Sequence, residues 1–241
     1  MRYLVLLYGD EALDPTPGTP EFDADMEGYV AFSELAGDAI VGGEALQPSK
    51  TARTVRHGDG EVRVTDGPFA EVVEALGGFY VLDAPTLDDA AELARHIPAV
   101  ASGAAEIRPM VEWTDLADER GPTPAGAARY MATIHGHEDG GETPDTMAWD
   151  EGAQAHGRFA EAAGDAIVAG AAVHPTTTAT TVRVRDGELL VSDGPFSEVV
   201  EVVGGFYVLR GTPTEVDAVG SLVPVGPAGA VELRPIMELG G

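Results

Sequence analysis

Asp66-Gly67-Pro68-Phe69 opens the stretch DGPFAEVVEALGGFYVL, which runs to Leu82 and occurs a second time from Asp193 to Leu209. The two copies lie 127 positions apart and are identical at 14 of 17 positions. The same offset aligns residues 1–82 with residues 128–209 without a gap, and about half of these positions are identical. Self-similarity at a fixed distance indicates a tandem duplication.

The duplication divides the chain into three segments. A closing Glu-Ile-Arg-Pro at 106–109 returns as Glu-Leu-Arg-Pro at 232–235. We therefore place the first repeat at residues 1–113 and the second at residues 128–239, each close to the usual size of one domain. Residues 114–127 between them are rich in Pro and Gly and lack apolar periodicity, which predicts a linker.

Each repeat shows the same order of predicted elements. Residues 3–8 form an apolar run typical of a buried strand, and apolar residues at helical spacing follow from 22 to 36. Residues 39–46 are extended, and alternating segments on both sides of Gly58-Asp59-Gly60 predict a hairpin. After the repeated motif come a strand, a helix that Thr86 caps, and a closing strand.

This order predicts an α+β fold in which helices cover one face of a largely antiparallel sheet. The other face of each sheet then needs a cover. Two repeats in one chain can supply it by packing their sheets together as an internal pseudo-dimer, and a further homodimer is compatible with this arrangement.

The charge of the chain limits its partners. Its 41 acidic residues against 14 Lys and Arg give a formal net charge of −27, which repels phosphate backbones and anionic lipid. We therefore expect neither nucleic acid nor a membrane as a partner. The acidity indicates a highly soluble surface, or alternatively a cationic partner. Absence of cysteine excludes disulfides and thiolate catalysis, and lack of a long apolar run or signal peptide predicts a cytoplasmic protein.

The motifs resemble those of the YCII-related, or DGPF-domain, family: Asp-Gly-Pro-Phe, an acidic residue, Gly-Gly-Phe-Tyr, a first strand ending Tyr8-Gly9-Asp10, and the closing Glu-Ile-Arg-Pro. The resemblance covers both repeats almost end to end. It implies a ferredoxin-like fold of the dimeric α+β barrel type and a pocket between sheet and first helix that contains a His and an Asp. Some members look like lyases or dehalogenating enzymes, and many in actinobacteria are encoded beside alternative sigma factors.

The resemblance places a His on the first helix, three residues before a Phe. His156 matches this place before Phe159, whereas Tyr29 occupies it in the first repeat. Helical spacing turns His156 toward the sheet, and the motif carboxylate Asp193 is its expected partner in an acid/base pair. Asp66 then faces Tyr29. The alternative is that both Asp side chains only cap their own Gly-Pro turns.

Four of the six histidines replace other residues of the first repeat: His135, His137, His156 and His174 stand where it has Tyr8, Asp10, Tyr29 and Gln47. This asymmetry predicts that the repeats have specialised. We expect the following residues to bind substrate: His135, His174 and Arg234 in the second repeat, and Tyr29, Asp66 and Arg108 in the first. Arg108 and Arg234 either meet an anionic ligand or pair with neighbouring acids.

The expected function is binding of a small molecule in the second repeat, with cofactor-independent acid/base chemistry such as elimination or isomerisation. No cofactor is expected. Three alternatives remain open: a non-catalytic regulator that acts with a partner such as a sigma factor, a cofactor-independent oxygenase, and a divalent-metal site. In the metal alternative His135 and His137, two apart on a strand, bind the ion with His156 or His174.

Overall fold

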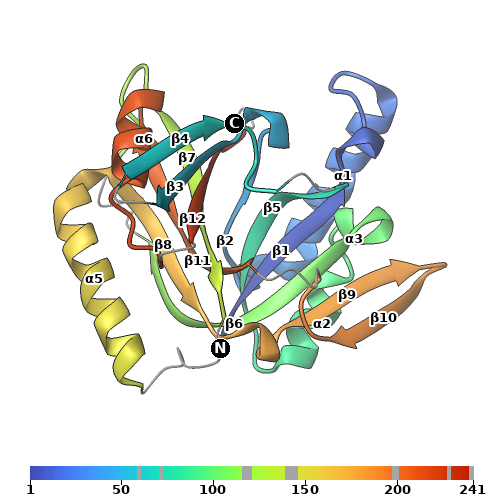
Figure 1. Cartoon of the computed structure of the whole chain (residues 1–241). Coiled ribbons are helices and arrows are strands. Elements are labelled where there is room, and N and C mark those ends of the chain that lie inside the picture. Colours follow the sequence, from blue (N-terminus) through green and yellow to red (C-terminus); the bar gives the residue numbers. More distant parts are fainter. Residues whose placement is uncertain are drawn as a thin grey trace. The chain divides into compact units, whose positions relative to one another are not determined.

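Figure 1 shows the protein as a computed structural model. The structure describes residues 1–58, 61–70, 73–115, 121–138, 146–196, 201–226 and 229–238, without the side chains of His137 and Glu201. The chain forms two compact units. Unit 1 comprises Met1–Ala45, Val72–Met110 and Thr176–Glu198, and unit 2 comprises Leu46–Glu71, Val111–Pro175 and Val199–Gly241.

Unit 1 is built on an antiparallel sheet with the strand order β2-β5-β1-β6-β9-β10. Its strands are β1 (Arg2–Asp10), β2 (Ile40–Ala45), β5 (Glu74–Asp83), β6 (Ala104–Asp115, whose last residues belong to unit 2), β9 (Thr180–Arg185) and β10 (Glu188–Asp193). Its helices are α1 (Pro20–Ala36), α2 (Leu87–Ala94) and α3 (Ala99–Ser102), with 3₁₀ turns at Glu11–Leu13, Gly37–Ala39 and Thr176–Thr178.

Unit 2 repeats this architecture with the strand order β8-β11-β7-β12-β3-β4. Its strands are β3 (Arg53–Gly58), β4 (Glu61–Asp66), β7 (Ala128–His137), β8 (Ile167–Val173), β11 (Glu201–Gly211) and β12 (Ala230–Pro235). Its helices are α5 (Met147–Ala163) and α6 (Pro213–Gly220), with 3₁₀ turns at Ser49–Thr51 and Gly164–Ala166.

The two β-hairpins are exchanged between the repeats. Hairpin β3-β4 comes from the first repeat, yet β3 pairs with β12 of the second, with Ala230 opposite Arg56. Hairpin β9-β10 comes from the second repeat, and β9 pairs with β6 of the first, with Ala105 opposite Val182. A repeat is therefore a unit of sequence, whereas each compact unit is assembled from both repeats.

The helices of each unit pack on one face of its sheet. In unit 1, alternate β1 residues Tyr3, Val5 and Leu7 form a core with α1, α2 and α3. In unit 2, Tyr130 and Ala132 of β7 form the matching core with α5 and α6. Side chains two apart on a strand share a face, so this packing follows from the apolar pattern. The prediction of an α+β fold with a mostly antiparallel sheet is confirmed.

Local signals mark several element boundaries, among them the predicted helix cap Thr86. Thr86 and Asp89 form a reciprocal capping box at the start of α2. Gly37, with φ +50°, ends α1. Asp186 and Gly187, both with positive φ, form the tight turn of the β9-β10 hairpin. The four-residue helix α3 was not predicted, because it is too short to show periodicity. Among the described residues, no helix is long and apolar enough to cross a membrane.

Candidate functional site

The repeated Asp-Gly-Pro-Phe turn closes back on its own hairpin. In unit 2, Gly67 has φ +101°, its N–H donates to the carbonyl of Ala52 at 2.8 Å, and its carbonyl accepts from the Thr54 hydroxyl at 2.9 Å. In unit 1 the corresponding bonds join Gly194 to Ala179 and Thr181 at the same distances. The positive φ explains the glycine of the motif.

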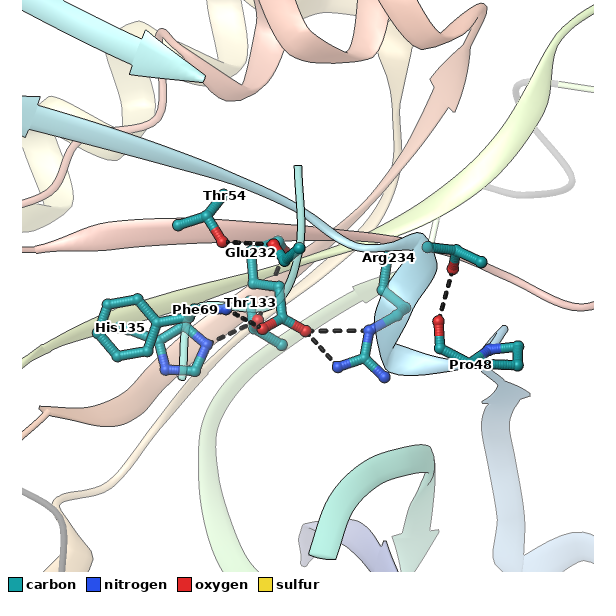
Figure 2. Close-up of polar contacts among 9 residues, drawn as sticks. Pro48, Thr54, Phe69, Thr133, His135, Glu232 and Arg234 are labelled. Carbon is teal, nitrogen blue, oxygen red and sulfur yellow. Dashed lines mark hydrogen bonds and ion pairs between the residues drawn. The ribbon is translucent and has the colours of Figure 1, made fainter. Parts of the chain in front are cut away.

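A buried glutamate of the closing motif then binds the motif phenylalanine. In unit 2 the N–H of Phe69 donates to Oε2 of Glu232 at 2.8 Å (Figure 2), and in unit 1 the N–H of Phe196 donates to Oε2 of Glu106 at 3.0 Å. We call this arrangement the glutamate clamp. In both units the motif and the glutamate come from different repeats, so the clamp fixes the exchanged hairpin to its sheet.

An arginine completes each clamp. Arg234, 4% exposed, donates from Nε to Oε1 of Glu232 at 3.0 Å and forms a close ion pair with it (Figure 2). Arg108, 1% exposed, lies 3.9 Å from Oε1 of Glu106. Buried charges need such partners. The structure thus places both arginines beside acidic side chains, which is the second of the two alternatives given for them above. That they bind substrate stays a prediction.

The motif phenylalanine also stacks on the first strand of the unit that receives it. In unit 2 the rings of Phe69 and His135 are 4.5 Å apart and nearly parallel, and Nε2 of His135 lies 2.9 Å from the Thr133 hydroxyl (Figure 2). In unit 1, Phe196 stacks on Tyr8 at 4.6 Å. The aromatic contact is therefore common to both units, and unit 2 makes it with a histidine.

His156 lies on the opposite side of the same sheet. From α5 its Nδ1 reaches the hydroxyl of Tyr207 on β11 at 3.0 Å. Phe159, one turn further on, packs against the Tyr207 ring with centroids 4.9 Å apart. Gly170 on the neighbouring strand β8 makes room for that ring, because a Cβ there would lie 2.8 Å from it.

Burial controls the proton affinities of this pair. It lowers the pKa of His156, which favours the neutral imidazole. Burial, together with the negative charge of Glu112, raises the pKa of Tyr207 to about 12, so its phenol keeps its proton at neutral pH. The contact is therefore a hydrogen bond between two neutral groups, and either tautomer of the imidazole can form it because the hydroxyl both donates and accepts.

Unit 1 has two tyrosines at the matching positions. Tyr29 of α1 stands where unit 2 has His156, and Tyr80 stands where it has Tyr207. Burial raises the pKa of Tyr29, which also hydrogen-bonds the backbone of Ala99, and burial raises the pKa of Tyr80. Phe32 packs edge-on against Tyr80 at 5.1 Å. The aromatic packing is the same in the two units, whereas an imidazole stands at this position only in unit 2.

The predicted site residues fall into separate places. His135 and His156 lie on opposite faces of the unit 2 sheet, because Ile134, next to His135, packs in the helix-covered core. His174 follows β8. Asp193, at the end of β10, is exposed and belongs to unit 1, so its pairing with His156 stays a prediction.

Two further predictions concern Asp66 and the metal alternative. The Asp66 side chain is 97% exposed, and Nε of Arg53 lies 3.9 Å from it. His137 lies on β7, but its side chain is outside the described residues. Within the described residues, no group of three or more His, Asp or Glu side chains could hold a metal ion.

Sequence reasoning missed the residues that organise both sites. Glu106 and Glu232 belong to the repeated closing motif, but a glutamate in an acidic chain is expected on the surface, and both are buried. The sequence feature that could have indicated their role is that each glutamate is repeated two residues before an arginine. Tyr207 was hidden in the apolar run of its strand, and its polar hydroxyl was the only indication of a role.

Comparison with known proteins agrees with the duplicated architecture. The model of the YCII-related domain matches residues 1–114 and again residues 128–240. An uncharacterized protein of Rhizobium meliloti (strain 1021) is 37% identical over 114 residues, which are 92% of that protein but 46% of this chain. One repeat therefore corresponds to nearly the whole of that relative. The chain belongs to the YCII-related domain family and carries the domain twice.

Proposed function

We propose that the second repeat provides a small-molecule site in which His156 transfers a proton, as in an elimination or isomerisation. The observation that carries this proposal is the hydrogen bond between Nδ1 of His156 and the hydroxyl of Tyr207 at 3.0 Å. A side chain held at one ring nitrogen presents the other nitrogen in a fixed direction, which is the usual arrangement of a histidine general base.

The proton affinities support the base role. With Nδ1–H donating to Tyr207, the Nε2 lone pair of His156 is available to accept a proton from a carbon next to a carbonyl group. The neutral phenol does not add a negative charge that would raise the pKa of the imidazole, and burial lowers it. His156 is then largely unprotonated at neutral pH, and Nε2–H can return the proton at another atom to complete an isomerisation.

In this proposal Asp193 is not the residue that positions His156. The family resemblance suggests a His and Asp pair, and Asp193 remains a candidate for binding substrate or the protonated imidazole. Because Tyr207 already occupies Nδ1, we assign the positioning of His156 to Tyr207. His135 and Arg234 line the other face of the sheet with the glutamate clamp, so we do not assign them to the same proton transfer.

Hydrogen exchange in D2O tests the proposal without a known product. The full chain is incubated with a panel of small carbonyl compounds that carry an acidic C–H, and deuterium incorporation is followed by NMR. We expect at least one compound to exchange, with a rate about 10²–10⁴-fold lower in His156→Gln, which is the range for a general base. Tyr29→Phe, the matched change in unit 1, should leave the rate unchanged. Equal rates in wild type and His156→Gln would contradict the proposal.

A second candidate function is non-catalytic partner binding, and the glutamate clamp is the observation that favours it. The clamp gives the repeated motif a structural task in both units, which needs no chemistry. A regulator should keep its partner binding in His156→Gln while showing no exchange in any variant. The same panel, combined with a pull-down using wild type and His156→Gln, separates the two functions.

We also propose that the two sheets pack face to face as an internal pseudo-dimer of the dimeric α+β barrel type. Leu4 and Leu6 alternate with the helix-facing residues of β1 and are fully buried, and Met131 of β7 is equally buried. Apolar faces of this kind need a cover. A crystal structure of the full chain tests this arrangement, and helix-free faces that met only solvent would contradict it.

A further inference from the structure

We propose that unit 2 carries a second ligand site, which binds a small organic anion with an apolar body in a hollow between α5, the segment after α6 and strand β3. The hollow has a volume of about 370 Å³. Its polar side chains are His57 of β3 and Arg158 of α5, and its apolar wall includes Phe159, Leu222, Val223 and Val225. Small-molecule sites commonly have volumes of about 300–1,000 Å³ and combine an apolar wall with a few polar groups.

The charge of the hollow is opposite to that of the protein. The chain has 41 acidic residues, yet none of the described residues that line the hollow is acidic. Arg158 is exposed at its edge, and within the described part of the chain no hydrogen bond or ion pair engages its guanidinium. A free guanidinium next to apolar side chains suits a carboxylate or sulfonate attached to a hydrocarbon group.

His57 supplies the second polar group. Its Nε2 is buried and has no hydrogen-bond partner among the described residues. A buried polar nitrogen without a partner destabilises the fold, so such atoms are usually found where a ligand or a water forms the missing hydrogen bond. A polar atom of the ligand, reached directly or after rotation of the ring, can satisfy it.

Unit 1 offers an internal comparison, because other residues stand at the matching places. Gly28 of α1 allows Pro98 to approach so closely that a Cβ would lie 2.9 Å from the proline ring. The matching position on α5 is Ala155, which lines the hollow. Val184, which packs against the unit 1 core, stands in place of His57, and Ala31 stands in place of Arg158. Unit 1 therefore lacks both polar groups at the matching positions, and Pro98 lies close to α1 at the position of Ala155.

The binding test uses 1-anilinonaphthalene-8-sulfonate, an aromatic sulfonate whose fluorescence rises in apolar surroundings, with the full-length protein. Hexanoate, hexanol and hexylamine then compete with it as anionic, neutral and cationic molecules of similar size. We expect saturable binding that hexanoate reverses and that the other two reverse poorly. Absence of saturation up to about 1 mM, or equal competition by hexanol, would overturn the proposal.

Two variants locate the site. Arg158→Ala should weaken probe binding about tenfold or more, the effect of losing one charge-assisted hydrogen bond. Arg63→Ala removes the same charge from a side chain that is 73% exposed on β4 and should change binding less than about twofold. His57→Val introduces the residue of unit 1 and should also weaken binding. Equal binding by Arg158→Ala and Arg63→Ala would contradict the site.

The polar groups of this site, His57 and Arg158, take no part in the hydrogen bond between His156 and Tyr207, although Phe159 both lines the hollow and packs on the Tyr207 ring. His156→Gln should therefore retain the probe with wild-type affinity. If His156→Gln abolished both deuterium exchange and probe binding, the two sites would be one, and the separate site would be refuted.

Discussion

Unit 1 and unit 2 have corresponding strand orders and the same glutamate clamp, but they differ in side chains on both faces of the sheet. At matching places unit 1 has Tyr8, Tyr29 and Val184, whereas unit 2 has His135, His156 and His57. Both units have a core of aromatic and aliphatic groups, and unit 2 adds imidazoles at these places and a hollow beside His57. The duplicated scaffold has thus kept the glutamate clamp and changed residues at the places where we propose ligand sites.

The hairpin exchange strengthens this contrast. His57 belongs to the first repeat in sequence but to unit 2 in space, so five of the six histidines, His57, His135, His137, His156 and His174, lie in unit 2. A comparison of the repeats by sequence alone would group His57 with residues of unit 1. The distribution of histidines in this protein therefore follows its compact units and not its sequence repeats.

Breaking the glutamate clamp should have the largest effect. Glu232→Ala leaves the buried guanidinium of Arg234 without this carboxylate, and we expect the free energy of unfolding to fall by about 3–5 kcal/mol. Urea denaturation measures it. Glu106→Ala in unit 1 is the matched variant and should cost less, since Arg108 lies further from its glutamate, at 3.9 Å. A change below about 0.5 kcal/mol in both would show that the clamp does not hold the fold.

Removing a contact found in unit 1 should have the next largest effect. Arg185 of the exchanged hairpin donates to the carbonyls of Val100, Ala101, Ser102 and Gly103 at the end of α3. Its counterpart in unit 2 is Gly58. Arg185→Ala should lower the free energy of unfolding by about 1.5–3 kcal/mol. Arg63→Ala, the exposed control, should have a free energy of unfolding near that of wild type. Equal stability of the two variants would show that the Arg185 hydrogen bonds do not stabilise the protein.

A pair of glycine substitutions compares the two tyrosine pockets. A Cβ at Gly170 would lie 2.8 Å from the Tyr207 ring, and one at Gly43 would lie 2.7 Å from the Tyr80 ring. Both changes to Ala should destabilise the protein by about 1–3 kcal/mol through overpacking. Only Gly170→Ala should also alter the NMR signals of the His156 imidazole. A shift of those signals in Gly43→Ala instead would contradict the proposal that only the Tyr207 pocket contacts His156.

The smallest expected effect is a pH dependence of stability that His156 contributes. Burial lowers its pKa in the folded protein below the ordinary histidine pKa of about 6.5, so the unfolded chain binds this proton more readily. The contribution is therefore fully present above about pH 6.5 and is lost as pH falls through the folded pKa. His156→Gln should show a weaker fall of stability over this range than wild type, measured by urea denaturation at several pH values. Tyr29→Phe should retain the wild-type slope.

The fold could be predicted from the sequence to a large extent, because periodicity, caps and turn residues are local signals. Thr86, Gly37 and the Asp186-Gly187 turn each mark a boundary by their own chemistry. The hairpin exchange could not be predicted, since a hairpin has the same alternation whichever strand it pairs with. In a tandem repeat the closing strands β6 and β12 have similar sequences, so each could accept either hairpin. Only the tertiary structure shows which hairpin pairs with which strand.

The candidate site was predicted only in part. His156 was placed on the inward face of its helix, and the structure puts it there, but its observed partner is Tyr207. The sequence favoured a carboxylate because the motif offers Asp193 in a repeated position. A tyrosine inside an apolar strand is indistinguishable from a core residue until its hydroxyl is seen to meet an imidazole.

The exchanged hairpins also determine when the protein can fold during synthesis. Unit 1 cannot complete its sheet until residues 180–193 have emerged from the ribosome, and β12 must reach back to pair Leu233 with Arg53. Closing such long loops is slow and delays cooperative folding of the first half. We expect nascent chains stalled before residue 180 to be protease-sensitive across residues 104–110, and protection of this strand at that length would contradict a late completion of unit 1. The order of translation thereby couples the two repeats into one folding event.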